Sequence, residues 1–431
     1  MLAPQPFMIK FLDKIFSRSN NLDYISKEIK NLKVYTPVSK IFNAIKNYSE
    51  TSEIRYVGGC IRKIINKEKI DDIDLATNLN PSELILALKK NNLNFYETGI
   101  EHGTITVLIN NYKFEITSLR EDFNTDGRHA DVKFSTDWKK DAARRDFSIN
   151  AIYADEDGNL FDPFNGKKDL KNGIVRFIGD PEKRIQEDYL RILRYLRFFL
   201  SYSNHHHDQN LLRILRKNII GISSLSKDRL FDELKKLLNS KILVKLSNDK
   251  YSIEFVEIIF PQLKKIKIFK NPNSFGKLKL DECDVIFLLS LLIIDDSDNL
   301  EFFIYKFNIP KKEQKRLRVI NNFFQKKITK KTFTEKNLNK FFYYYGKEAV
   351  IDVISYRLFN LKKIDQELID MINNFKTKVK PTMPFGAKLL MSEYNIPKGK
   401  ILGNKLKIIE EEWVNNNFKL SNEQLNDILS S

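Results

Sequence analysis

The hydrophobic and polar positions change their period several times in the first third of the chain. Apolar residues recur at helical spacing over residues 37–50 and again over 80–92, a segment that opens with an Asn-Pro pair suited to a helix start. Residues 54–57 form a short apolar run, and residues 103–119 contain two β-rich runs on either side of Asn110-Asn111. The pattern predicts a buried strand, two helices and a hairpin in one small mixed α/β unit.

The remainder of the chain is helical by pattern. Residues 185–200 place leucines and aromatics on one side and arginines on the other, which predicts a single helix. The longest apolar run, residues 285–294, is far shorter than the roughly 20 residues that span a bilayer, so it predicts a buried helix. Residues 397–413 predict a turn and a final amphipathic helix, and no repeat of fixed period is visible.

These patterns predict the α+β class, with a small mixed-sheet head followed by an elongated all-α neck, body and tail. The expected divisions are an N-terminal helical segment over residues 1–36, the head over 37–180, the helical neck over 181–240, and the helical body and tail over 241–431. A chain of 431 residues is long enough for more than one hydrophobic core.

The amino-acid composition bears on the class of binding partner and on the cellular location. Lysine and arginine exceed aspartate and glutamate by 17, an excess that attracts nucleic acid but also occurs on a lysine-rich surface kept for solubility, and composition leaves both readings open. The lysines around Lys311, Lys326 and Lys330 allow the same two readings. The two cysteines, Cys60 and Cys283, are too few for a disulfide framework and lack metal-ligand spacing, which favours a reducing, cytoplasmic location.

The segment from Tyr56 to Thr77 has the layout of a nucleotide site. Gly58 and Gly59 let the backbone turn closely, so the helix that follows can direct its N-terminus at an anion such as a triphosphate. Asp72 and Asp74 lie two apart in a predicted strand, so both carboxylates point to one face, where they can bind Mg²⁺ together with substrate phosphates. Taken alone, the same letters also fit a strand that ends in a solvated acidic turn.

Two further segments carry charged side chains that suit nucleotides. In DAARRDFSINAIY, residues 141–153, Arg144 and Arg145 offer donor forks to phosphates and Asp146 can hold one of them in place. In the helix predicted over residues 185–200, Asp188 and Arg191 are three apart and share a face, while Glu187 and Arg191 are four apart and can pair. Solvated surface ion pairs are the alternative for both segments.

The remaining candidate side chains are expected to lie outside the chemistry. Residues 120–134 are polar and glycine-containing, which predicts a loop with His129 at the surface. His205, His206 and His207 are consecutive and cannot all face one ion, so a solvated surface is expected. Residues 226–238 predict a serine-capped helix with Arg229 and Glu233 as an i, i+4 pair.

The glycine pair, Arg62 and the two aspartates resemble the Gly-Gly-x-x-Arg loop and Asp-x-Asp strand of the class II nucleotidyltransferases, the CCA-adding tRNA nucleotidyltransferases and their poly(A) polymerase relatives. Residues 144–151 are similar to the family's Arg-Arg-Asp-Phe-Thr-Ile-Asn-Ala motif, with Ser148 in place of threonine. Residues 162–181 resemble its Asp-Pro-x-x-Gly segment, expected as a loop. Lys63 stands where the family usually carries an aspartate, a departure that bears on the local support of Arg62.

The resemblance implies template-independent addition of CCA to tRNA 3′ ends from CTP and ATP with Mg²⁺, releasing pyrophosphate. It implies catalytic roles for Asp72, Asp74 and Glu115, with Mg²⁺ on the first two, and a base-reading role for Asp188 and Arg191. Cytosine and adenine both present an amino group beside a ring acceptor, which suits a carboxylate next to a guanidinium. The nucleotide-binding residues so implied are Gly58, Gly59, Arg62, Arg145, Asp146, Asn150, Asp188, Arg191 and Arg194.

Two alternatives stay open at the level of sequence. A poly(A) polymerase on the same scaffold would use ATP alone and accept RNAs without tRNA shape. A non-catalytic RNA-binding helical protein with a vestigial head would have no reason to keep the motif residues. The polar loop over residues 120–134 resembles the one that complete CCA-adding enzymes retain, which favours full CCA addition.

Overall fold

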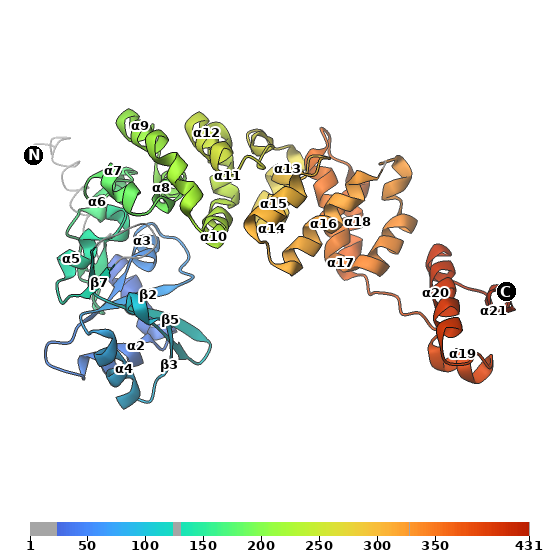
Figure 1. The fold of residues 1–431 in the computed structure, drawn as a ribbon, viewed down its shortest axis with the longest axis horizontal. Coiled ribbons are helices and arrows are strands. Elements are labelled where there is room, and N and C mark those ends of the chain that lie inside the picture. Colours follow the sequence, from blue (N-terminus) through green and yellow to red (C-terminus); the bar gives the residue numbers. More distant parts are fainter. Residues whose placement is uncertain (1–23, 124–130, 327, 431) are drawn as a thin grey trace, which may run out of the picture. The chain divides into compact units, whose positions relative to one another are not determined.

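The computed structural model describes residues 24–123, 131–326 and 328–430. The chain separates into two compact units, Met1–Arg229 and Leu230–Ser431 (Figure 1). The first unit contains the strands and the second is built from helices, which confirms the predicted fold class. The four-part division of the chain stays a prediction.

The first unit is organised around a mixed seven-stranded sheet with the order β3-β4-β5-β2-β1-β8-β9. Antiparallel pairing joins all neighbours except β2 and β5, which run parallel and place Asp74 opposite Glu115. The predicted hairpin is β4 and β5, and Asn110 in its turn has a φ of 55°. The strands are β1 (Ile54–Val57), β2 (Ile73–Thr77), β3 (Asn94–Gly99), β4 (Thr104–Ile109), β5 (Tyr112–Ser118), β8 (Tyr153–Ala154) and β9 (Leu160–Phe161).

Helices pack on this sheet through apolar side chains. Phe42 of α2 and Leu84 of α4 are fully buried in one cluster with Tyr56, Leu75 and Ile116 of the sheet. The Asn-Pro start of α4 forms a complete capping box with Glu83, as its sequence predicts. The helices are residues 24–35, α2 (Val38–Lys46), α3 (Gly59–Ile65), α4 (Pro81–Lys90), α5 (Trp138–Ala143) and α6 (Gly166–Asn172), with 3₁₀ turns at Ile100–His102 and Ser148–Asn150.

Two segments expected as loops contain regular structure. Within residues 120–134, β6 (Arg120–Phe123) and β7 (Asp131–Phe134) pair as an antiparallel ribbon, so the loop prediction is wrong for both flanks. Their polar sequence gave no strand signal, because a solvated two-stranded ribbon needs no alternating apolar face. His129 lies outside the described residues. Residues 162–181 include α6, so that loop prediction is also wrong in part.

The single helix predicted over residues 185–200 is two helices. α7 (Pro181–Glu187) ends before Asp188, whose backbone is extended at φ −156° and ψ 103°, and α8 (Leu190–Tyr202) begins after it. The Asp188 carboxylate accepts a hydrogen bond from the backbone N–H of Leu190 at 3.2 Å. A short acidic side chain that binds nearby backbone competes with the helix, which explains the break.

Helices continue through the second unit, as predicted. α14 is buried at every position from Ile286 to Ile293, and no helix in the described residues is long and apolar enough to cross a membrane. The later helices are α9 (Gln209–Asn218), α10 (Lys227–Leu237), α11 (Ser240–Asn248), α12 (Lys250–Ile259), α13 (Ser274–Lys279), α14 (Val285–Ile293), α15 (Asn299–Phe307), α16 (Lys311–Gln325), α17 (Glu335–Asn360), α18 (Gln366–Thr377), α19 (Ala387–Glu393), α20 (Lys400–Asn415) and α21 (Asn422–Ser430). The predicted final helix is α20, and it is not the last, because α21 follows and buries Leu425 in the same small core.

Candidate nucleotidyltransferase site

Three carboxylates gather where β2 and β5 run side by side. Asp74 and Glu115 are register partners on the two strands, and Asp72 immediately precedes β2. Asp72 is exposed, whereas Asp74 and Glu115 are half-buried. Burial raises the pKa of the Asp74 carboxyl above its ordinary value, and the negative charges of Glu115 and Asp72 raise it further. The predicted carboxylates therefore lie close enough together to interact electrostatically.

The donor set fits a magnesium ion better than a metal bound by protein alone. Among the described residues no group of three or more His, Cys, Asp or Glu side chains is placed to hold a metal ion. Glu115 also accepts a hydrogen bond from Lys113 at 2.6 Å. Mg²⁺ commonly takes only one or two carboxylates and completes its shell with water and substrate phosphates. The oxygens of Asp72 and Asp74 match that requirement, and a cation there would relieve the repulsion that raises the pKa of Asp74.

The Gly-Gly turn lies against the same carboxylates. Gly58 adopts a φ of +68°, and a Cβ there would lie 3.4 Å from Nη1 of Arg145. A Cβ on Gly59 would lie 3.8 Å from an Asp74 carboxylate oxygen and 4.0 Å from Nη2 of Arg62. Two guanidinium groups and a carboxylate therefore line the surface where the backbone turns, and a larger residue at Gly58 would be strained.

Arg62 is buried and fixed by residues far away in the sequence. Its Nε donates to the Tyr202 hydroxyl at 3.1 Å, its Nη1 donates to the side-chain oxygen of Asn150, and its guanidinium carbon lies 4.7 Å from the Phe198 ring centre. Lys63 instead reaches Asp71 at 2.7 Å. The departure from the family pattern therefore does not leave Arg62 unsupported.

Arg145 is held by a buried carboxylate that the sequence did not single out. Its Nε donates to the Tyr153 hydroxyl at 2.9 Å, and its Nη2 lies 3.4 Å from Asp141. Asp141 is 1% exposed and also binds Arg144 at 2.7 Å. Burial alone would raise the pKa of Asp141, but Arg144 and Arg145 hold it below its usual value. The prediction that Asp146 holds one of these arginines is wrong, because Asp141 is one helical turn away on α5 and reaches both.

Asp146 pairs with Arg194 of α8 instead. One of its oxygens accepts from Nε of Arg194 at 2.7 Å, and the other accepts from the Asn150 amide at 2.8 Å and the Phe147 N–H at 2.9 Å. Since Asn150 also accepts from Arg62, these side chains form one chain of contacts from α3 to α8. Asp146, Asn150 and Arg194 thus lie together, and Asn150 connects them to Arg62.

The two residues expected to read the base do not stand one above the other on a single helix. Asp188 lies at the break and accepts from Arg229 at 2.7 Å. Arg191 pairs with Glu187 at 2.6 Å, which confirms that predicted contact, and also donates to the Arg184 carbonyl at 2.6 Å. The expected pairing of Arg229 with Glu233 is replaced by the contact with Asp188.

The prediction that the three consecutive histidines are all solvated is wrong for His207. It is 5% exposed, its Nδ1 lies 3.0 Å from the Tyr195 hydroxyl, and its ring stacks on Phe199 with centres 3.6 Å apart. Only His205 and His206 fit the expected solvated surface. The run of three gave no periodicity from which the buried member could be recognised.

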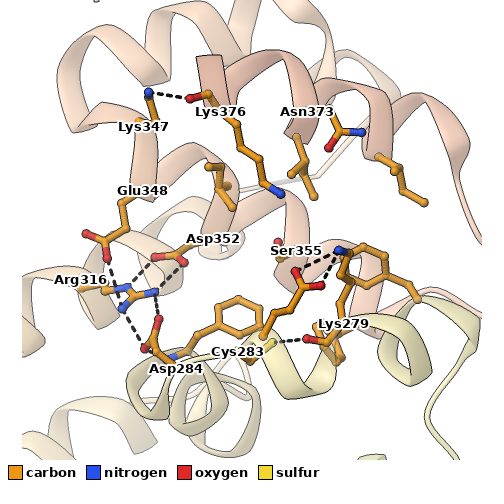
Figure 2. Close-up of a pocket in the computed structure, with 17 residues that line it drawn as sticks. Lys279, Cys283, Asp284, Arg316, Lys347, Glu348, Asp352, Ser355, Asn373 and Lys376 are labelled. Carbon is orange, nitrogen blue, oxygen red and sulfur yellow. Dashed lines mark hydrogen bonds and ion pairs between the residues drawn. The ribbon is translucent and has the colours of Figure 1, made fainter. Parts of the chain in front are cut away.

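The second unit contains a pocket of about 500 Å³ between α13, α14, α16, α17 and α18 (Figure 2). Arg316 forms ion pairs there with Asp284 and Asp352 at 2.7 Å each and with Glu348 at 3.4 Å. None of the predicted site residues lines it. The ion pairs satisfy Arg316 and its carboxylate partners, and the pocket gives no sign of the chemistry expected from the head.

Comparisons with known proteins identify the family that the chain resembles. A family model described as the poly A polymerase head domain matches residues 54–176. Human CCA tRNA nucleotidyltransferase 1, mitochondrial, is 33% identical over 390 residues, which cover 87% of this chain and 86% of that protein. The CCA-adding enzyme of Staphylococcus saprophyticus is 30% identical over 304 residues, covering 70% of this chain and 72% of that protein.

Solved structures share the fold. The Bacillus stearothermophilus CCA-adding enzyme in complex with CTP superposes with a TM-score of 0.66 at 21% identity, covering 91% of this chain and 97% of that chain. The Thermotoga maritima CCA-adding enzyme complexed with tRNA gives a TM-score of 0.56 at 20% identity, covering 94% and 98%. With a relative 33% identical over most of both lengths, this chain belongs to the CCA tRNA nucleotidyltransferase family.

Proposed function

We propose that this protein adds CCA to the 3′ ends of tRNA without a nucleic-acid template, using CTP and ATP and releasing pyrophosphate. The observation that carries the proposal is the meeting of Asp74 and Glu115 with Arg62 and Arg145 around the Gly-Gly turn. Acidic groups beside buried guanidinium groups are what phosphoryl transfer requires, because its catalysis consists mostly of positioning and charge stabilisation. Family membership adds the substrates.

In this mechanism the carboxylates and arginines have separate roles. Asp72 and Asp74 would hold Mg²⁺, which when bound supplies positive charge to the reacting phosphate and the departing pyrophosphate. Arg62 and Arg145 bind the triphosphate oxygens, and Gly58 and Gly59 let the phosphates approach the backbone. Tyr153 and Asp141 hold the Arg145 guanidinium in place, so its positive charge is fixed in position before substrate arrives. A charge that is positioned in advance reduces how far the site must reorganise to stabilise the transition state.

Asp188 and Arg191 are proposed to select the base, each through a partner that fixes it. The ion pair with Arg229 orients the Asp188 carboxylate, and the pair with Glu187 orients the Arg191 guanidinium. An oriented acceptor and donor can bind cytosine or adenine, whereas uracil and guanine present the reverse order and would match neither group. Base selection would then depend on Asp188, which lies at the break between α7 and α8, and on Arg191, which follows in α8.

The helical body and tail, residues 241–431, are proposed to bind tRNA. The excess of 17 positive charges over the chain favours phosphate contacts that release counterions. The cytoplasmic location expected from the cysteines stays a prediction, and the relatives include both mitochondrial and bacterial proteins.

One assay tests the proposal. Purified protein is given a tRNA that ends at its discriminator base, Mg²⁺, and CTP and ATP singly and together, and the products are sequenced. Two C residues with CTP alone and a complete CCA with both nucleotides are expected. Long A tails from ATP alone, on RNAs without tRNA shape, would assign the poly(A) activity that the name of the matched head domain suggests. No incorporation from any nucleotide would refute both.

A further inference from the structure

We propose that Tyr202 is the positioning residue that fixes Arg62 toward the Gly-Gly turn and connects it to the negative charge of Glu68. Tyr202 is the last residue of α8, 140 residues beyond Arg62 in the sequence. The consequence for nucleotide binding rests on the proposed function, since it takes Arg62 as a ligand of the triphosphate.

The Tyr202 hydroxyl has both of its roles defined. It accepts a hydrogen bond from Nε of Arg62 at 3.1 Å, so its own proton is free to be donated elsewhere. The acceptor is Oε2 of Glu68 at 3.2 Å. Glu68 lies in the segment between α3 and β2 that leads to Asp72. One phenol therefore joins the end of α8, the buried arginine and the segment before the aspartates.

The surroundings of Arg62 leave one of its nitrogen atoms, Nη2, available for a ligand. Nε is taken by Tyr202 and Nη1 by Asn150, while the rings of Phe198 and Tyr202 lie 4.7 and 5.3 Å from the guanidinium carbon. In the part of the chain that the structure describes, Nη2 makes no hydrogen bond, and it lies 4.0 Å from the Cβ position of Gly59. The fixed contacts thus aim Nη2 at the turn.

The charge balance explains why a phenol suits this position. Arg62 is 8% exposed, yet among the described residues no carboxylate lies within ion-pair distance of it. A carboxylate in direct contact would neutralise the guanidinium and compete with an anionic ligand. A neutral hydroxyl backed by Glu68 orients the group and leaves most of its charge for phosphate. Lys63 cannot contribute a negative charge, and its ammonium is engaged with Asp71.

Tyr202→Phe tests the idea because it removes the hydroxyl and keeps the ring that packs on Arg62. We expect the Kd of CTP, of ATP and of inorganic triphosphate, measured by calorimetry without tRNA, to rise together by about fivefold, as for one lost hydrogen bond. In steady-state addition, KM should rise by the same factor for CTP and ATP with kcat within about twofold. Glu68→Gln should change the three Kd values by less than about twofold, since the glutamine side-chain oxygen can still accept the Tyr202 proton.

Tyr112→Phe is the matched control, because the Tyr112 hydroxyl also bonds a distant partner, the Tyr35 carbonyl at 3.0 Å, on a different part of the unit. It should leave all Kd values unchanged. In an Arg62→Ala background, Tyr202→Phe should have no further effect on triphosphate binding. Unchanged Kd values for Tyr202→Phe, or an equal further loss without Arg62, would overturn the proposal. Because the binding measurements need no catalysis, failure of the CCA assay with the unaltered protein would be seen separately.

Discussion

Arg194→Ala would leave the buried carboxylate of Asp146 without its guanidinium partner. Asp146 is 8% exposed, and stranding a buried charge costs about 3–5 kcal/mol when nothing else compensates it. Here Asn150 and the Phe147 N–H still bind one of its oxygens, and the side chain of Arg194 is 30% exposed, so water can reach the vacated place. We therefore expect the free energy of unfolding of the first unit to fall by about 2–3 kcal/mol at pH 7.

The dependence on pH gives the sharper test. Burial alone would raise the pKa of Asp146, but Arg194 and the Asn150 amide lower it below its ordinary value. A carboxyl whose pKa is lower in the folded state stabilises the fold above its unfolded pKa of about 3.9, and this contribution is lost as the pH falls further. The stability difference between the unaltered protein and the variant should be complete at pH 7 and shrink below about pH 4.

Fluorescence can follow the first unit alone. The chain has two tryptophans, Trp138 in the first unit and Trp413 in the second, so urea titrations in a Trp413→Phe background report on the head. Arg213→Ala on α9 is the control, since Arg213 is exposed and bonds only the nearby Asn210 side chain, at 3.3 Å, among the contacts described. It should change stability by less than about 0.5 kcal/mol. An Arg194→Ala variant as stable as this control, or a deficit that persists unchanged at acid pH, would refute the reasoning.

Three further outcomes are expected. Asp72→Asn and Asp74→Asn should each reduce nucleotide addition at least about a thousandfold at saturating Mg²⁺, with unchanged tRNA affinity. Asp71→Asn is the control, because it loses only the exposed ion pair with Lys63 and should keep near-normal rates. Near-normal nucleotide addition by the Asp72 and Asp74 variants would contradict the metal assignment. Asp188→Ala should slow CTP and ATP use and raise the relative incorporation of UTP and GTP on one tRNA, and an unchanged ratio of the four rates would mean that the base is read elsewhere. Arg316→Ala should destabilise the second unit by about 3 kcal/mol in urea titrations of Trp138→Phe protein, because Asp352 is 4% exposed and loses its partner, and a smaller loss than 1 kcal/mol would contradict that role.

The sequence determined the elements whose signals are local. The start of α4 follows from an Asn-Pro pair and a glutamate three residues on, and the hairpin follows from two β-rich runs around Asn110, which accepts a positive φ. The motif letters likewise located Asp74 and Arg62, because their spacing along a strand and a turn is part of the pattern. In each case the information lies within about ten residues, where backbone preference and hydrophobic period act.

Only the tertiary structure decided which groups meet. Asp188 binds Arg229 and Arg62 binds Tyr202 across 41 and 140 residues, and no local pattern encodes either choice. Arg145 took Asp141 rather than the adjacent Asp146, since neighbours in a turn point apart while the last turn of α5 faces it. For Asp188 and Arg62 the physical reason is the same: a charge that is largely removed from water must find a partner, and the packing of distant helices determines which one is within reach.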